Sequence, residues 1–512
     1  MIRGLSGGRL FPAAPASAPP PHEGPESIRR NTAFALAMRI VGAVFTGGLT
    51  LFLVRYLGPD DYGVYALAIS VGGLLLLPAD AGVSRSAARF IAERRGEPSQ
   101  VFGVLHQAVV LKAIASALVA AALAALAAPI ADAYDVPDLE WPLRIVAVAL
   151  VGQSFMLLFS TTFEALGRNS LGFRLAFSES ALEVSASLAL VLSGAGVAGA
   201  VGGRAIGYGC AAVLGLVLAL RAIGGLRLGR PPSSGFGVRR IAAYAGALFV
   251  VDAAFAAFSQ IDVLMIGAFL DAESAGFFSA PAQILLFTAY LGQALAAGVA
   301  PRLAYGPGRD PDLDSFQFAL RLILAVQVAF AVPFLVWAEP ITDLLLGPDY
   351  AESADVFRGL TPFVVLVGPS VLLSLGINYL GEARRRVPLA LAAIAINAAI
   401  DAVLIPKIGI IAGAIGTNVA YLVFVGGHVL ICRRVIGLPL REPALTLLRA
   451  SIAGGCMAAV LFAFGTASLS AVELIAGGIL GVLAYAAGLL VTGEVGRGEL
   501  DAARRMLGRE HR

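Results

Sequence analysis

The sequence predicts an all-α polytopic membrane protein with about fourteen transmembrane helices. Of its 512 residues, 58% are hydrophobic and only 14% are charged, whereas soluble globular chains carry about 25% charged residues. The apolar residues fall in runs of about 20, the length that spans a bilayer. Basic residues gather in alternate segments between the runs, as they do in loops that face the cytoplasm.

The two ends of the chain differ from the apolar middle. Residues 1–30 contain the stretch "LFPAAPASAPPPHEGPES", which lacks the continuous apolar core of a signal peptide. We expect a disordered cytoplasmic tail there, and a second cytoplasmic tail at residues 495–512, which include the basic "ARRMLGREHR".

Turn residues and charges divide the apolar sequence into the predicted helices. Their ranges are 33–57, 62–82, 103–128, 142–162, 175–194, 197–220, 241–269, 275–299, 315–337, 359–380, 389–406, 409–431, 444–464 and 471–492. The shortest separations are Gly194–Gly196 and Ile405–Gly409. In the latter, Pro406 and Gly409 are able to end one helix before the next begins.

The loops fix the orientation. Alternate segments read "SRSAARFIAERRGE", "RLGRPPSSGFGVRR", "GEARRRVP" and "CRRVIGLPLRE", and hold most of the basic residues. The others read "GPDDYG", "ADAYDVPDLEWP", "LDAES" and "EPITDLLLGPDYAESADVF" and are acidic. The positive-inside rule therefore places both termini in the cytoplasm, with Asp61 outside and Ser99 and Arg385 inside.

The sequence around one predicted outer turn is partly repeated later in the chain. The stretch "LGPDDYGVYALA" aligns with "LDAESAGFFSAP", so that Leu57 meets Leu270 and Gly63 meets Gly276. An even number of predicted helices separates the copies, which therefore share one orientation. This indicates a parallel repeat about an axis along the membrane normal. The alternative is that any acidic outer turn before an aromatic residue shows the same pattern.

The first of these turns is predicted to shape a hairpin tip. Gly58 and Gly63 are expected to end and restart helices, and Pro59 to prevent a continuous helix. Because Asp60 and Glu273 are both acidic, we expect the two tips to repel each other weakly rather than hold together.

Four stretches carry a resemblance to a known family. "LFLVRYLGPDDYGVYALAISVGGLLLLPADAGVSRSAARFIAERRGE" resembles the opening helix pair of the Wzx-type lipid-linked oligosaccharide flippases, whose superfamily includes the MATE drug exporters and lipid II flippases. "SQIDVLMIGAFLDAESAGFFSAPAQI" is similar to the family's seventh and eighth helices. "LLLGPDYAESADVFRGLTP" and "IPKIGIIAGAIGTNVAYLV" resemble its later landmarks. The resemblance runs from about Arg30 to about Arg434, and the last two helices match poorly.

The resemblance implies a MATE-like bundle of two lobes related by a parallel pseudo-two-fold axis. The expected divisions are an N-lobe at 31–228, a C-lobe at 229–438 and accessory helices at 439–494. Alternating access would carry a polyprenyl-diphosphate-linked oligosaccharide, a polysaccharide repeat unit, across the bacterial inner membrane. A glycan polymerase is an expected partner besides membrane lipids. No cofactor, metal or nucleic acid is expected.

Four arginines are the candidate substrate-binding residues, because ionisable groups inside membrane helices usually face protein or a water-filled cavity. They are Arg39, Arg85, Arg89 and Arg321. Guanidinium offers a planar fork of donors that suits a diphosphate. The alternative for Arg89 and Arg321 is that the side chains extend to the inner headgroups. Arg55, near the outer surface, is expected to extend to the headgroups on that side.

Four acids are the candidate ion-coupling residues: Glu179, Glu183, Asp252 and Asp262. Buried carboxylates can exchange protons, so ion-coupled antiport is one interpretation. Structural pairing, for example with Arg39 across the cavity, is the other. Asn397 and Asp401 share a helix face and are suited to joining their helix to a neighbour.

The sequence shows no enzyme signature and leaves several functions to compare. A MATE-like drug or cation antiporter would favour acids in the cavity. Lipid II flippases carry an arginine in helix eight, where this chain has Gln283 and Gln293. A membrane glycan polymerase or ligase would be expected to carry a large outer loop, and the longest one here is about twenty residues. The arginines favour the oligosaccharide flippase.

Overall fold

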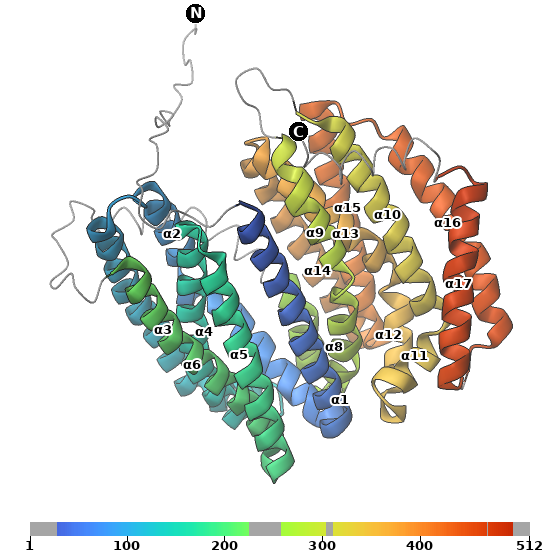
Figure 1. Ribbon diagram of the computed structural model, residues 1–512. Helices are drawn as coiled ribbons and strands as arrows, with labels where there is room; N and C mark the ends of the chain where they lie inside the picture. The colour runs from blue at the N-terminus through green and yellow to red at the C-terminus, as the bar shows by residue number, and fades with distance from the viewer. Residues whose placement is uncertain (1–27, 225–257, 304–310, 468, 495–512) are drawn as a thin grey trace, which may run out of the picture.

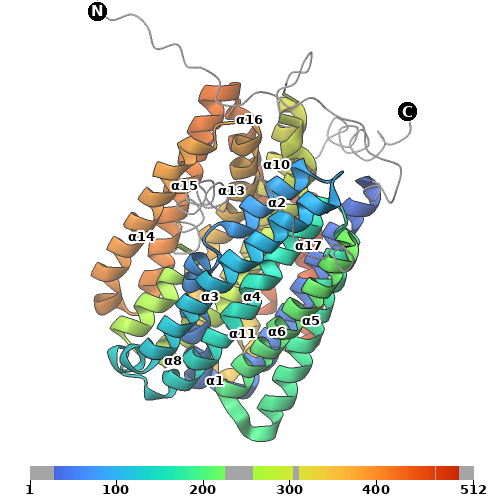
Figure 2. The same cartoon turned by 90° about the vertical axis from the view of Figure 1, so that its left-hand side faces the viewer.

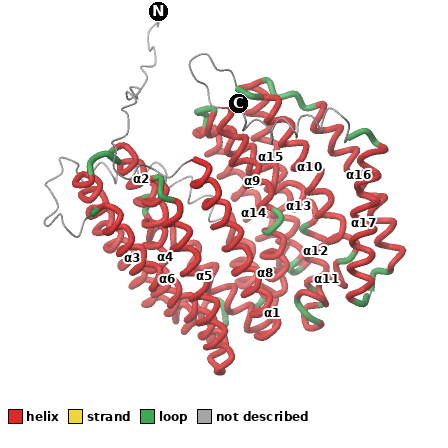
Figure 3. Tube along the Cα trace, viewed as in Figure 1, coloured by secondary structure: helices red, strands yellow, loops and turns green. Residues whose placement is uncertain are grey.

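The computed structural model describes residues 28–224, 258–303, 311–467 and 469–494. Throughout these ranges the regular structure is helical, and no strand occurs in them (Figure 3). The helices form two groups, one from α1 to α6 and the other from α8 onward, with α1 between them (Figure 1). The predicted all-α class is confirmed.

The first group contains two continuous helical segments that each turn back on themselves, namely α1 and the joined pair α5 and α6. Its helices are α1 (Ile28–Asp80), α2 (Val83–Glu93), α3 (Pro98–Ala133), α4 (Glu140–Leu166), α5 (Asn169–Leu190) and α6 (Gly196–Ile223). Gly58 interrupts α1 with φ 75°, a left-handed conformation that glycine adopts without strain. The π turn Val191–Ala195 joins α5 to α6, with Gly194 at φ 93°. Both turns confirm the predicted separations.

The second group begins, in the described chain, with the short helix Phe258–Phe269. It continues with α8 (Ala272–Leu286), α9 (Ala289–Val299), α10 (Leu313–Val336), α11 (Ala338–Leu345), α12 (Ser353–Gly359), α13 (Thr361–Tyr379), α14 (Arg386–Ile408) and α15 (Ile411–Ile436). Helices α16 (Arg441–Phe464) and α17 (Ala471–Val491) lie at one edge, with α16 packed against α10 (Figure 1).

Ten described helices are long and apolar enough to cross a membrane. Two of them, Ala33–Asp80 with 48 residues and Asn169–Ile223 with 55, are long enough for two crossings each. Figure 2 shows the same parallel arrangement of helices from the side. One prediction is wrong in detail: the expected helix 275–299 is broken at Thr288, whose hydroxyl donates to the carbonyl of Leu285 at 2.7 Å.

The two groups touch where α1 and α8 turn. The backbone at Gly63 lies so close to α8 that an added Cβ would overlap the carbonyl oxygen of Ala272. A Cβ at Gly276 would overlap the carbonyl oxygen of Pro59. The two tips are therefore in contact here, although Asp60 and Glu273 are both acidic. Gly63 also does not restart a helix, since it lies within α1 without a positive φ and is needed for close approach.

Arg55 makes a second link between the groups at the same end of the molecule. Its guanidinium donates to the carbonyl oxygens of Leu345, at 3.1 Å, and Leu344, in the last turn of α11. A cation is stabilised at a helix C-terminus by the helix dipole and its unpaired carbonyls. Arg55 thus joins α1 to α11 instead of extending to the headgroups as expected.

Candidate functional site

A polar cavity of about 270 Å³ lies between the two halves of α1, α4, α5, α6 and the first helices of the second group. The polar side chains in its lining include Thr46, Thr50, Tyr65, Gln153, Ser180, Glu183, Arg204, Gln260, Ser279 and Gln283. A concave site with convergent polar groups is the ordinary form of a small-molecule site.

An ion pair between α5 and α6 forms one wall of the cavity. Arg204 donates to Glu183 Oε1 at 3.3 Å and to the Tyr208 hydroxyl at 3.1 Å. Glu179, one turn from Glu183, is 5% exposed and lies within the field of the same guanidinium. Two carboxylates therefore share one arginine. Gly207 permits this close packing, since a Cβ there would lie 2.9 Å from the Glu183 Cβ.

Sequence reasoning missed Arg204. The signal was present, because an arginine inside the apolar run 197–220 needs a polar partner. Pairing was one of the two interpretations of Glu183, but the partner is Arg204 of the same lobe and not Arg39.

Arg39 and Arg85 lie near one carboxylate, beyond the end of the cavity that is nearer to the start of α1. Both side chains are exposed, and both positive charges act on the carboxylate of Glu164 in α4. Arg39 also donates to Gln293 Oε1 at 3.1 Å, which links α1 to α9 of the second group. Thr46 at the cavity lies two turns further along α1, about 10 Å at 1.5 Å rise per residue. Two exposed guanidinium groups here are able to hold a diphosphate.

The other two predicted arginines have carboxylate partners. Arg89 pairs with Glu93 at 3.1 Å on the exposed face of α2. Arg321 pairs with Glu494 at 2.8 Å and donates to Thr446 Oγ1 at 2.9 Å. The structure therefore places Arg39 and Arg85 near one carboxylate, that of Glu164, and places Arg321 against α16 and the end of α17, away from the cavity.

A second cluster of buried oxygens lies in the second group. Asp262 accepts hydrogen bonds from Asn397 Nδ2 and Thr417 Oγ1, both at 2.5 Å. Asn397 and Asp401 are fully buried, and their Oδ1 atoms have no hydrogen-bond partner within the described chain. A Cβ at Gly416 would overlap Asp401 Oδ1 and lie 2.9 Å from Asn397 Oδ1. The two free oxygens therefore face the same point on α15.

These oxygens are the ligand type that hard cations prefer. Two carboxylates, an amide oxygen and a hydroxyl come from three helices, and the oxygens of Asp401 and Asn397 lie directly against Gly416, where any side chain would collide with them. Asp262 was predicted from the sequence, whereas Asp401 was expected only to join helices. The predicted Asp252 lies outside the described residues.

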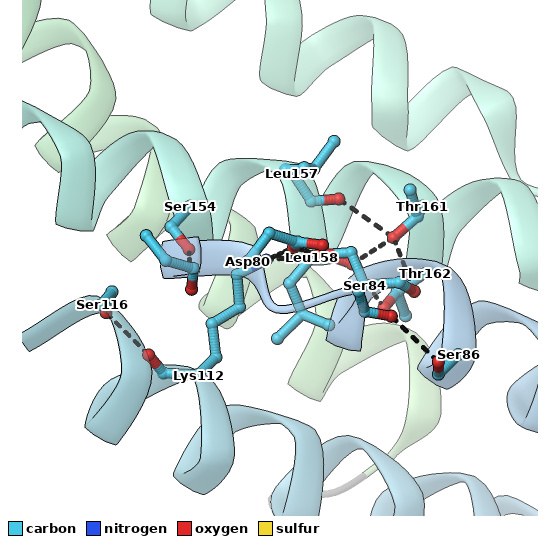
Figure 4. Close-up of polar contacts among 12 residues, drawn as sticks. Asp80, Ser84, Ser86, Lys112, Ser116, Ser154, Leu157, Leu158, Thr161 and Thr162 are labelled. Atoms are coloured by element: carbon cyan, nitrogen blue, oxygen red, sulfur yellow. Dashed lines mark hydrogen bonds and ion pairs between the residues drawn. The ribbon is translucent and has the colours of Figure 1, made fainter. Parts of the chain in front are cut away.

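A third polar cluster stabilises the two-residue break between α1 and α2. Ala81 and Gly82 adopt left-handed conformations, with φ 47° and 69°. Lys112 of α3 is fully buried and contacts Asp80 and Ser84, on either side of the break (Figure 4). Because the charges balance and these residues do not line the cavity, we interpret the cluster as structural.

Comparison with known proteins agrees with this architecture. The family model described as "Polysaccharide biosynthesis protein" matches residues 28–303. No curated protein matches the sequence significantly. Among solved structures, the lipid II flippase MurJ in an inward closed conformation is similar with a TM-score of 0.70 and 14% identity, over 90% of this chain and 98% of that one.

Two multidrug resistance MATE family transporters of the MOP superfamily are also similar. The inward-facing structure has a TM-score of 0.58 and 14% identity, over 79% of this chain and 98% of that one. The outward-facing structure has a TM-score of 0.56 and 16% identity, over 80% and 96% of the two chains. These likenesses establish the fold, as the resemblance in the sequence predicted.

Proposed function

The chain belongs to the polysaccharide biosynthesis protein family, and we propose that it is a flippase for a polyprenyl-diphosphate-linked oligosaccharide. The lipid-linked glycan moves from the inner to the outer leaflet as the two lobes, 31–228 and 229–438, open alternately to either side. We further propose that the protein resides in the bacterial inner membrane with both termini cytoplasmic. A glycan polymerase then consumes the flipped unit.

The pair of arginines at the inner side of the cavity carries this proposal. A diphosphate needs several charge-assisted hydrogen bonds, which Arg39 and Arg85 are able to supply from α1 and α2. Gln293 of α9 already accepts from Arg39. A bound diphosphate would compete for that guanidinium and so act on the link between the lobes.

We propose that a hard cation such as Na⁺ couples to transport at the cluster of Asp262, Asn397, Asp401 and Thr417. The free Oδ1 atoms of Asn397 and Asp401 support this choice. The predicted role of Glu183 in ion coupling is less well supported, because Arg204 already neutralises it. The same argument applies to Glu179, because it shares Arg204 with Glu183.

A MATE-like cation exporter is the second candidate, and two neighbouring glutamates favour it: Glu183 lines the cavity, and Glu179 lies buried one helical turn away. A lipid II flippase is a third, since the MurJ fold is similar. An experiment can separate the first two candidates by charge, because a lipid diphosphate needs the exposed arginines and a cationic drug needs Glu179 or Glu183.

Ligand binding to the purified protein tests the proposal. We expect a polyprenyl diphosphate to raise the melting temperature, and a cationic dye to leave it unchanged. Arg39→Ala should abolish the shift, and Arg39→Lys should restore part of it, because lysine binds phosphate only as a point charge. Arg144→Ala is the control. Arg144 lies at the end of α4 opposite Glu164 and pairs with Glu140 at 2.6 Å. Stabilisation by the dye alone would overturn the proposal in favour of the exporter.

A further inference from the structure

We propose that the cavity between α1, α4, α5 and α6 is a subsite for one uncharged sugar residue of the glycan. This inference rests on the proposed function and adds the recognition of the sugar to that of the diphosphate. The flippase would then bind some glycans selectively instead of accepting any group on a polyprenyl diphosphate.

The chemistry of the lining fits sugar hydroxyls. Amides and hydroxyls dominate its polar side chains, and each is able to donate and accept hydrogen bonds. Gln153 and Gln283 approach the cavity from opposite lobes and make no hydrogen bond to any described residue. Their amides are therefore available to a ligand. The carboxylate of Glu183 offers a stronger, charge-assisted acceptor for a sugar hydroxyl.

The size of the cavity limits its occupant. Its volume of about 270 Å³ is many times the roughly 10–15 Å³ that one water molecule needs on the same measure. One pyranose ring with its hydroxyl groups fits this space. Selection would therefore act on one residue of the glycan.

The position of the cavity fits a sugar attached to a diphosphate at Arg39. Thr46 of the lining lies about 10 Å further along α1, at 1.5 Å per residue. The first half of α1 thus runs from the arginines to the cavity, and a short glycan is able to bridge that distance. Tyr62, Ser279 and the contact between α1 and α8 close the far end.

The charges of the cavity disfavour an acidic sugar. Arg204 is the only cation among the described lining residues, and it already bonds to Glu183 and Tyr208. Glu179 adds a second buried carboxylate within its field. A uronic acid would bring a third carboxylate next to one guanidinium, where the like charges repel. An uncharged hexose avoids that repulsion.

Binding of defined synthetic lipids to the purified full chain tests the subsite. The probes are a polyprenyl diphosphate without sugar, one with a neutral trisaccharide, and one with a trisaccharide that ends in a uronic acid. We expect the neutral trisaccharide to bind at least tenfold more tightly than the bare diphosphate. We expect the uronic acid to remove most of that gain.

The double variant Gln153→Leu, Gln283→Leu should lose the gain and keep the affinity for the bare diphosphate. Each lost hydrogen bond is expected to weaken glycan binding by about 2- to 13-fold. The control is Gln327→Leu, a buried amide of α10 outside the cavity. The single variant Gln283→Leu, at an exposed position, serves if the double variant is unstable.

Two results overturn the subsite and leave the proposed function standing: an unchanged glycan gain in the glutamine variants, or tighter binding of the uronic acid lipid. Failure of the wild-type protein to bind any of the three diphosphates overturns the proposed function, and the subsite with it.

Discussion

Replacing Gly63 by alanine is expected to open the outer side of the protein. The added Cβ would overlap the carbonyl oxygen of Ala272 in α8, and both atoms belong to rigid helical backbone. Overpacking of this kind costs about 1–3 kcal/mol. Parting the tips of α1 and α8 relieves the overlap, so the equilibrium should shift toward the outward-open state by roughly 5- to 140-fold.

The rate of labelling by a membrane-impermeant maleimide measures this shift. The reporter is Thr46→Cys in the lining of the cavity. In the proposed orientation, the contact between α1 and α8 lies between this position and the outside. The background carries serine at Cys210, Cys432 and Cys456, because two of these cysteines are exposed. In Gly63→Ala, outside labelling should accelerate by the factor given above.

A matched control separates the contact from the effect of alanine on the helix. Gly48 lies in the same helix, and an added Cβ there meets nothing within 4 Å. Gly48→Ala should therefore label like the parent. Equal labelling rates in Gly63→Ala and Gly48→Ala would refute the argument that close backbone packing holds the outer side closed.

Three other experiments test the link from Arg55 to α11, the proposed cation site and the topology. Arg55→Ala should raise the outward-open population by roughly 2- to 5-fold, because a cation at a helix C-terminus contributes about 0.3–1 kcal/mol; equal outside labelling of parent and variant would show that the link to α11 has no role. Gly416→Ala should abolish stabilisation of the purified protein by Na⁺, whereas Gly426→Ala, with nothing within 4 Å of the added Cβ, should retain it; a sodium response in both would exclude the site. A cysteine at Asp61 should react with an impermeant reagent from outside intact cells and one at Ser99 only from inside, and labelling of both from one side would refute the topology.

The helices were predictable because lipid offers the backbone no hydrogen-bond partners. Each apolar run must satisfy its own hydrogen bonds, so length, turn residues and loop charges suffice to place it. Gly58 was recognised as a turn for the same local reason. Gly63 was misread as a turn residue, since its neighbour in α8 is distant in the chain and leaves no local signal.

The partners of the buried charges were not predictable in the same way. The depth of Arg321 indicates only that it needs a partner, and nothing local points to Glu494 near the end of the chain. Likewise, Asp262 was selected as an intramembrane acid, but Asn397 and Thr417 reach it only because α14 and α15 pack beside its helix. The sequence shows which charges need a partner, and tertiary packing determines which group becomes that partner.

Translocation in proteoliposomes tests the central claim most directly. A labelled polyprenyl-diphosphate-linked oligosaccharide is placed in both leaflets, and its arrival in the outer leaflet is followed with an impermeant quencher. The account predicts faster translocation with the protein than in protein-free liposomes, a loss of at least tenfold in Arg39→Ala, and wild-type rates in Arg144→Ala. Translocation by Arg39→Ala at the wild-type rate, or none by the wild-type protein, would contradict it.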